Sequence, residues 1–159
     1  MREVTLSNGM VALVDDEDYE LVAGSVWHYA LRRNTGYACK NVKKADGKWT
    51  QVLMHRALTN FGRAHIDHVD GNGLNNQKSN LRAATVSQNS ANARKRRHKT
   101  SSPYKGVCWD KHKGKWMAYI QASGARRFVG YFDTDLEAAQ AYNRAAVAAS
   151  GEYAKTNDV

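Results

Sequence analysis

The sequence predicts an α+β protein assembled from short antiparallel hairpins and a small number of helices. Strand-like stretches of alternating apolar and polar residues flank Asn-Gly and Asp-Gly pairs, which are strong hairpin-turn signals. Two Thr-x-x-Gln/Glu stretches stand directly before helix-like spacing, where they form helix capping boxes. The chain has 159 residues, of which 42% are apolar, enough for one ordinary domain or two small packed ones.

The first 50 residues predict two hairpins and a helix between them. The Asn-Gly pair at 8–9 separates two strands, and the Asp-Gly pair at 46–47 separates the strands "GYACKNV" and "KWTQVLM". The segment "DDEDYELVAGSVW" opens with acids, which suit the positive end of a helix dipole. A metal cluster is the alternative for these acids, Asp15, Asp16 and Asp18.

Residues 52–98 predict a helix, a strand–loop–strand unit and a second helix. The stretch "VLMHRALTNFG" has helical spacing, and the short strands are "AHIDH" and "NLRAAT", joined by a polar loop. Thr85 and Gln88 form the first capping box, so the second helix is expected to run through "VSQNSANARKRR". Its basic end suits the negative end of the helix dipole and consists of Arg94, Lys95, Arg96 and Arg97.

The C-terminal third predicts a three-stranded antiparallel sheet with one helix. The segments "YKGVCWD", "KWMAYIQAS" and "RRFVGYFD" are strand-like and are separated by Gly-containing turns. Thr134 and Glu137 form the second capping box, which opens an alanine-rich helix that stops at Gly151. The small alanine side chains allow this helix to lie close on the sheet.

Basic charge is concentrated in the middle of the chain. The formal net charge is +9, and residues 51–98 carry 8 basic and 2 acidic side chains, whereas residues 1–50 carry 7 of each. Such a field favours a polyanion, most often nucleic acid. The basic linker "RKRRHKTSSP" is expected to lie along DNA, with a solvated tether as the alternative.

Other features of the sequence exclude several classes of protein. No apolar run approaches the roughly 18 residues of a membrane span, and no signal-peptide pattern follows Met1. Cys39 and Cys108 are isolated, so a structural zinc of the usual kind is not expected and a reducing cytoplasm fits. We therefore expect a cytoplasmic protein with no membrane partner and no small-molecule cofactor.

The pair Asp67-His68, at the end of the first strand of the strand–loop–strand unit, is the strongest candidate for chemistry. Asn89 falls in the first turn of the following helix, which is expected to pack back across the strands. Aspartate and asparagine oxygens can share one hard divalent cation, and a neighbouring histidine can take a proton from water. Considered alone, His68 is predicted to be a turn residue and Asn89 an ordinary polar helix residue.

Taken together, the stretch "IDHVDGNGLNNQKSNLRAATVSQN" closely resembles the HNH (His-Me finger) nuclease motif of phage and intron-encoded homing endonucleases. The resemblance implies a ββα-metal module of two strands and a helix around one divalent metal, Mg²⁺ or Mn²⁺. It assigns His68 as general base, Asn80 as the residue that ties down the loop, and Asp67 and Asn89 as metal ligands. His55, in "MHR", is expected to be structural.

The reaction implied by this resemblance is phosphodiester hydrolysis in DNA. Water gives its proton to neutral His68, and the metal stabilises charge on the leaving 3′ oxygen. Arg82, on the second strand, is placed to clamp a phosphate, and a strand-surface salt bridge is the equal alternative. A DNA-binding regulator that does not cut is the alternative function, although it would not need Asp67, His68 and Asn89 together.

The C-terminal third closely resembles the AP-two-type DNA-binding domain of plant ethylene-response factors. The resemblance rests on "YKGV", "GKW", "VGYFDT" and "EAAQAYNRAA", and implies a three-stranded sheet in the DNA major groove. Phe128 stands where the family has Trp, so the plant target sequence does not carry over. The residues expected to contact DNA are Lys105, Lys115, Trp116, Arg126 and Arg127, with a core position as the alternative for Trp116.

These expectations give one layout. Residues 1–98 form an HNH nuclease domain with preceding β-hairpins and a core motif over 52–97, residues 99–102 a linker, and residues 103–159 the AP-two-like DNA-binding domain. The expected protein is a phage-encoded endonuclease in a bacterial host, acting on double-stranded DNA as a monomer or dimer. One active site per chain makes nicking by a monomer the simplest expectation.

Overall fold

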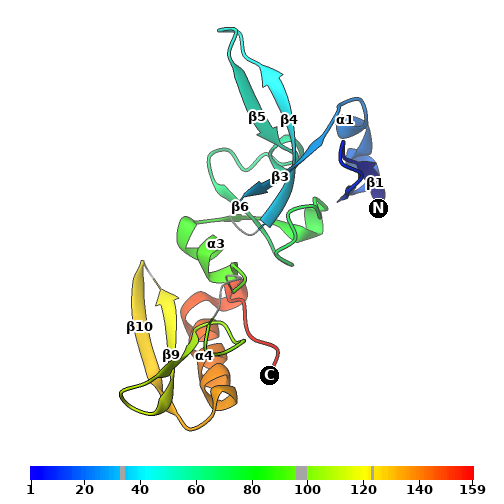
Figure 1. Cartoon of the computed structure of the whole chain (residues 1–159). Helices are drawn as coiled ribbons and strands as arrows, with labels where there is room; N and C mark the ends of the chain where they lie inside the picture. Colours follow the sequence, from blue (N-terminus) through cyan, green and yellow to red (C-terminus); the bar gives the residue numbers. More distant parts are fainter. Residues whose placement is uncertain (33–34, 96–99, 123) are drawn as a thin grey trace. The chain divides into compact units, whose positions relative to one another are not determined.

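The computed structural model describes residues 1–32, 35–95, 100–122 and 124–159. Its architecture is α+β, with small antiparallel sheets and short helices (Figure 1). The residues divide by their contacts into two compact units, Met1–Ala84 and Thr85–Val159. In the described ranges, no helix has the length and apolar content that a bilayer crossing requires.

Both hairpins expected in the N-terminal unit are confirmed. β1 (Arg2–Thr5) pairs antiparallel with β2 (Val11–Val14), and β4 (Thr35–Lys43) pairs antiparallel with β5 (Trp49–Leu53). The turn glycines adopt positive φ, +81° at Gly9, which costs glycine little because it has no Cβ. A further strand, β3 (His28–Arg32), pairs with β4 and was not predicted.

The helices of this unit are shorter than the sequence predicts. The acidic segment forms the 3-10 turn η1 (Asp16–Asp18) followed by α1 (Tyr19–Ala23). The sequence predicts that the helix in "VLMHRALTNFG" stops at Gly62. α2 (Met54–Leu58) ends four residues earlier, because Thr59 is already extended at φ −122° and ψ 147°. Both helices therefore amount to little more than one turn, and their stability must come from the core beneath them.

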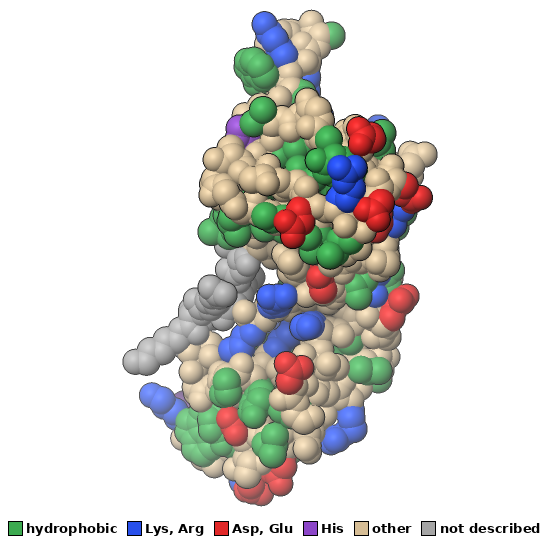
Figure 2. Space-filling view, turned by 90° about the vertical axis from the view of Figure 1, so that its right-hand side faces the viewer, with side chains coloured by type: hydrophobic (Ala, Val, Ile, Leu, Met, Phe, Trp, Pro, Cys, Tyr) green, Lys and Arg blue, Asp and Glu red, His purple; other side chains and the backbone are tan. Residues whose placement is uncertain are grey.

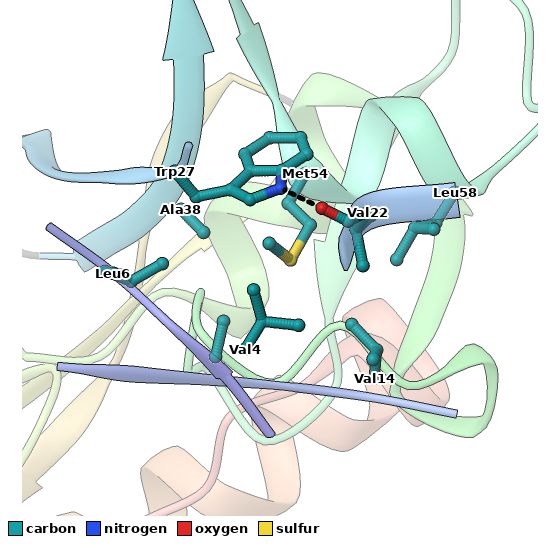
Figure 3. Close-up of a cluster of buried hydrophobic side chains, with 9 residues drawn as sticks. Val4, Leu6, Val14, Val22, Trp27, Ala38, Met54 and Leu58 are labelled. Carbon is teal, nitrogen blue, oxygen red and sulfur yellow. Dashed lines mark hydrogen bonds between the residues drawn. The ribbon is translucent and has the colours of Figure 1, made fainter. Parts of the chain in front are cut away.

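That core joins the first hairpin, α1, α2 and β4 around Trp27. Figure 3 shows the Trp27 indole among apolar side chains from these elements, with its Nε1–H donating to the Val22 carbonyl at 2.9 Å. This hydrogen bond lets the indole be fully buried without leaving its N–H unpaired. The core side chains are Val4, Leu6, Ala12, Val14, Val22, Trp27, Ala38, Met54 and Leu58.

The strand–loop–strand unit is formed as predicted. β6 (His65–His68) pairs antiparallel with β7 (Leu81–Ala84), and the 3-10 turn η2 (Lys78–Asn80) leads into β7. The two strands form a separate two-stranded sheet. Their register places Asp67 opposite Arg82 and His68 opposite Leu81.

The helix after β7 is α3 (Val86–Asn92), and its predicted capping box is confirmed. The Thr85 hydroxyl accepts from Gln88 N–H at 3.2 Å, and the Gln88 side chain accepts from Thr85 N–H at 2.7 Å. The predicted basic end of this helix is wrong: α3 ends at Asn92, because Ala93 turns to ψ 136°. Arg94 and Lys95 follow the helix, and Arg96 and Arg97 lie outside the described residues.

The C-terminal unit contains the three predicted strands and the predicted helix. β8 (Val107–Asp110), β9 (Lys115–Ala122) and β10 (Ala125–Phe132) form an antiparallel sheet in the order β10-β9-β8. α4 (Asp135–Ser150) begins at the predicted capping box and ends at Gly151, with φ +52°. It packs on the sheet through small side chains, including the fully buried Ala138 and Ala139.

α3 is grouped with this C-terminal unit, where it contacts α4, β9 and the 3-10 turn η3 (Gly151–Tyr153). The Ala91 carbonyl accepts from Lys155 N–H at 3.2 Å. The division by contacts thus falls between Ala84 and Thr85, earlier in the chain than the boundary near residue 98 expected from the sequence. The ββα-metal arrangement of β6, β7 and α3 stays a prediction.

Candidate active site and DNA-binding surface

The β6–β7 hairpin buries the two residues that the sequence singles out. Asp67 is 3% exposed and His68 is 5% exposed. Because neighbouring strand residues point to opposite faces, the two side chains have different surroundings. Asp67 faces Arg82 across the ladder, whereas His68 faces a cluster of rings from β4 and α2.

Asn80 fixes the loop between the strands. Its side-chain oxygen accepts from Asp70 N–H at 3.0 Å, and its Nδ2 donates to Asp70 Oδ1 at 3.0 Å and to the Asn75 carbonyl at 2.8 Å. The Asn80 carbonyl also accepts from Val69 N–H at 2.9 Å. One buried amide therefore holds both ends of the loop directly after His68.

Asp70 is a second organising residue of this loop, and it is not among the site residues predicted from the sequence. Its carboxylate accepts from Asn72 N–H at 2.7 Å and from the Asn75 and Asn80 amides. Burial alone would raise the pKa of Asp70, but these hydrogen bonds and the nearby His68 hold the pKa below its ordinary value. The Asp-Gly-Asn sequence at 70–72 is a turn signal that could have indicated this role.

The loop is also anchored to the N-terminal strands. Asn76 N–H donates to the Leu13 carbonyl at 2.7 Å, and Leu13 N–H donates to the Leu74 carbonyl at 2.8 Å. Gly73 passes so close to β4 that a Cβ would lie 2.4 Å from the Gly36 carbonyl oxygen. The loop is thus held by contacts along its length with β2 and β4, and not only at its two ends.

The acidic segment at residues 15–18 supports the same loop. The Asp15 carboxylate accepts from Lys78 N–H at 2.7 Å and from Gln77 Nε2 at 3.3 Å. Lys78 Nζ pairs with Glu17 at 2.5 Å and with Asp18 at 3.1 Å. Within the described ranges, no three His, Cys, Asp or Glu side chains are grouped to hold a metal ion, and these acids serve as local hydrogen-bond and ion-pair partners.

A buried cluster of rings surrounds His68. The His68 ring centroid lies 5.0 Å from that of His55 on α2 and 5.7 Å from that of Tyr37 on β4, and His55 and Tyr37 are 5.6 Å apart. His55 is 6% exposed. The sequence gives no sign of this cluster, because its three members come from separate elements.

Burial keeps both imidazoles neutral near pH 7. Burial, together with smaller effects of the charges of His68, Arg56 and Arg32, lowers the pKa of His55 to about 3. Burial also lowers the pKa of His68, although a hydrogen bond with Asn76 and the charges of Asp70 and Asp67 oppose the shift. A neutral imidazole is the form that can accept a proton.

Arg82 forms an ion pair with Asp67. Its Nε and Nη2 both lie 2.9 Å from Asp67 Oδ2, and the two side chains are 16% and 3% exposed. Of the two roles considered for Arg82, the salt bridge is therefore present in the structure, although it is buried in the hairpin and does not lie on the strand surface. Breaking a buried ion pair of this kind by removing one partner is usually strongly destabilising.

Asn89 and Asp67 are oxygen donors of the kind that a hard divalent cation prefers. Asn89 lies in the first turn of α3, half-buried, with its N–H donating to the Thr85 carbonyl at 3.0 Å. Asp67 belongs to the N-terminal unit and Asn89 to the C-terminal unit. The donor chemistry of the two residues fits magnesium or manganese.

The outer face of the C-terminal sheet exposes aromatic and basic side chains. Phe128 and Tyr131 are 59% and 42% exposed, and their rings lie 5.0 Å apart. The Arg126 guanidinium carbon lies 3.5 Å from the Tyr119 ring centroid. The register places Arg126, Phe128 and Tyr131 opposite Gln121, Tyr119 and Met117, so these side chains share the face turned away from α4.

Trp116 lies on the opposite face of this sheet. It packs against the core of Val107, Ala118 and the α4 alanines, and its ring meets that of Trp109 at 5.1 Å. Of the two roles left open for Trp116, the core position is the one observed. Strand alternation gives the reason, since its neighbour Lys115 points to the outer face and pairs with Asp133.

The remaining basic residues expected at DNA differ in their surroundings. Arg127 is exposed at the start of β10. Lys105 precedes β8 and is half-buried, with Nζ donating to the Ala91 carbonyl at 2.6 Å. Lys95 Nζ donates to the Ser102 and Tyr104 carbonyls, both at 2.7 Å, and Arg94 is exposed.

Basic charge is unevenly compensated over the surface. On the face drawn in Figure 2, acidic side chains lie beside basic ones in places and basic side chains gather in others. In the N-terminal unit, Lys78 pairs with Glu17, and Arg2 pairs with Glu20 at 3.4 Å. These surface pairs reduce the local positive field without contributing much stability.

Comparison with known proteins gives partial relatives of two kinds. No family model and no solved structure matches the sequence. An uncharacterised HNH endonuclease of Acanthamoeba polyphaga mimivirus is 38% identical over 95 residues, which are 60% of this chain and 48% of the viral protein. Protein 3.8 of Escherichia phage T7 is 40% identical over 60 residues, 38% of this chain and 49% of its own length.

The second kind of relative is a plant transcription factor. An AP2-like ethylene-responsive transcription factor of Arabidopsis thaliana is 42% identical over 59 residues, 37% of this chain and 12% of the plant protein. The chain spans about half the length of the two viral relatives. It is thus similar in part to a protein named as an HNH endonuclease and in part to AP2-like factors.

Proposed function

We propose that this protein is a metal-dependent DNA endonuclease of the HNH type, in which His68 is the general base and the C-terminal unit binds double-stranded DNA. The observation that carries the proposal is the β6–β7 hairpin, which holds a buried, neutral His68 next to Asp67. The loop that follows His68 is fixed by hydrogen bonds of Asn80. The partial identity to the mimivirus HNH endonuclease supports the same function.

His68 accepts a proton from the attacking water in this proposal. The rings of His55 and Tyr37 restrict the orientation of the His68 ring, and burial keeps the His68 imidazole uncharged. Asn80 contributes by holding the backbone directly after His68, which keeps the imidazole at a fixed position relative to the loop. A well-positioned base of this kind typically accelerates a reaction by about 10²–10⁴-fold.

Asp67 and Asn89 would hold one magnesium or manganese ion. When bound, such an ion polarises the scissile phosphate and stabilises charge on the leaving oxygen. Arg82 fixes the position of the Asp67 carboxylate inside the hairpin through its two contacts with Oδ2. Arg82 is also the residue that we assign to phosphate binding.

The outer face of the C-terminal sheet supplies the contact with DNA. Arg126 offers a charge to a phosphate, and the exposed Phe128 and Tyr131 rings offer apolar contact to base edges. The similarity to the AP2-like factor supports this assignment. We further assign the chain to the homing type, with a single active site that nicks one strand in each encounter.

A nicking assay tests this function against a non-cutting regulator, the alternative that the similarity to a transcription factor favours. Supercoiled plasmid is incubated with the full chain and Mg²⁺ or Mn²⁺, and open-circular product is measured. The proposal predicts nicking that disappears when a chelator is added and returns with excess metal. DNA binding without any nicking, across several plasmids and both metals, would instead identify a regulator.

A further inference from the structure

The C-terminal unit contains a basic pocket that lies outside all of its strands. The pocket has a volume of about 260 Å³ and is lined by the segments 94–95, 103–105 and 155–158. Its charged lining residues are Arg94, Lys95, Lys105, Lys155 and Asp158. Four cations and one carboxylate leave a strong excess of positive charge around a space of this size.

The walls of the pocket are cross-linked by hydrogen bonds. Asn157 accepts from Lys105 N–H at 2.6 Å and donates to the Lys105 carbonyl at 3.1 Å, while Asn143 bonds both the N–H and the carbonyl of Asn157. Lys155 N–H and Lys105 Nζ both donate to the Ala91 carbonyl. The basic side chains are therefore presented by backbone segments that are fixed relative to one another.

The three lysines of the pocket lack close acidic partners among the residues that the structure describes. In the part of the chain that the structure describes, no carboxylate lies within ion-pair distance of Lys95, Lys105 or Lys155. Burial and the neighbouring Lys155 lower the pKa of Lys105 to about 8. The charge of Lys155 therefore disfavours the charged form of Lys105, and an anion bound beside both would offset this effect.

We propose that this pocket is a binding site for one phosphate group. The side chains of three lysines and one arginine suit the charge and the several acceptor oxygens of a phosphate. If the proposed function holds, the natural source is a backbone phosphate of DNA, held at a point separate from the outer face of the sheet.

Phosphate titration of the full chain, followed by NMR of backbone amides, tests the site. Inorganic phosphate is added in the presence of chelator while chloride keeps the ionic strength constant. We expect saturable shifts at the Lys105 and Asn157 amides, which line the pocket. Shifts that are absent, do not saturate or spread evenly over the surface would overturn the proposal.

Lys155→Gln is the informative variant, since Lys155 bonds Ala91 through its backbone N–H, so we expect the substitution to retain the fold. It should weaken phosphate binding roughly fivefold or more. Lys111→Gln, an exposed lysine of the same unit outside the pocket, should leave binding unchanged. Equal affinities for both variants would contradict the assignment.

A duplex arm identifies the source of the phosphate. If DNA is the source, a short duplex should shift the same amides, inorganic phosphate should compete with it, and Lys155→Gln should flatten the log–log salt dependence by about one unit. Saturable binding of inorganic phosphate without any response to duplex would keep the site and assign it to a free phosphate. Because chelator is present throughout, neither result depends on nuclease activity.

Discussion

The two units place their polar and apolar groups in opposite ways. In the N-terminal unit the candidate residues Asp67, His68 and Asn80 are 3%, 5% and 6% exposed, whereas in the C-terminal unit Phe128 and Tyr131 are 59% and 42% exposed. Burial of hydrogen-bonded polar groups fixes their geometry and protonation. Exposed rings and cations on a flat sheet suit contact with a large partner. Positioning of reactive groups thus favours burial, whereas binding of a large partner favours exposed side chains.

Removal of the buried Asp67 carboxylate should have the largest effect. Asp67→Ala should abolish cleavage at ordinary magnesium concentrations, and it leaves the Arg82 charge without its partner in the hairpin. We expect the free energy of unfolding to fall by about 3–5 kcal/mol, the usual cost of breaking a buried ion pair. Thermal unfolding and Mn²⁺ titration calorimetry measure the two effects.

Asp67→Asn is the matched variant, because it keeps the shape of the side chain and removes only its charge. Metal binding should weaken in both variants, and by more in the alanine variant. If calorimetry gave the wild-type affinity for Mn²⁺ in both variants, Asp67 would have no part in the metal site.

The close packing of Gly73 against β4 should contribute to stability. Gly73→Ala places a Cβ about 2.4 Å from the Gly36 carbonyl oxygen, a backbone atom that cannot move aside cheaply. The free energy of unfolding should fall by about 1–3 kcal/mol, as is typical of overpacking. Gly24→Ala is the control, since no atom lies within 4 Å of its added Cβ and its φ is not positive. Equal stability of the two variants in urea unfolding would show that the loop is not tightly seated.

Buried histidines predict a loss of stability in acid. The pKa of His55 is about 3 in the folded chain and near 6.5 in an unfolded one, so the unfolded state binds the proton first. Stability is complete above about pH 6.5 and falls as the pH drops towards 3. His55→Phe keeps a ring in the cluster and removes this titration.

The midpoint of thermal unfolding, measured from pH 7 to pH 4.5, checks this prediction. It should fall steeply for the wild type and less steeply for His55→Phe. An identical pH dependence in the two proteins would mean that His55 is not held neutral by the fold.

The smallest expected effect lies on the outer face of the sheet. Arg126→Gln should lower the slope of log binding constant against log salt by about one unit, because one phosphate contact is lost. Arg144→Gln removes an exposed arginine from α4 instead and should leave the slope unchanged. Gel-shift titrations at several salt concentrations compare the two, and equal slopes would remove the sheet from the DNA-binding surface.

Local sequence signals predicted much of the fold. The turns at 8–9 and 46–47 and both capping boxes depend on residues within four positions of one another, so their physics is visible in the chain itself. The predicted end of α3 was wrong because good helix formers follow Asn92 in the sequence. Helix propensity is a weak signal that tertiary structure overrides. Strand β3 was missed because its stability comes from pairing with β4.

The site was predictable in part for the same reason. Asp67, His68 and Asn80 belong to one contiguous motif. Because strand side chains alternate between two faces, the sequence also predicts that Asp67 and His68 point to opposite faces of β6. The partner of Asp67 could have been found from the hairpin register, which places Arg82 opposite it. The ring cluster of Tyr37, His55 and His68 comes from three elements, so no local pattern reveals it.

The central claim is that the buried His68 performs chemistry while other residues hold the DNA. The most direct measurement follows cleavage of a labelled duplex with Mg²⁺, and binding of the same duplex with chelator, in wild type, His68→Ala and His65→Ala. His65 lies on the same strand but is exposed, which makes it the matched control. The account predicts that His68→Ala cleaves about 10²-fold more slowly or not at all and binds as the wild type does, while His65→Ala changes neither. Cleavage by folded His68→Ala at the wild-type rate would contradict it.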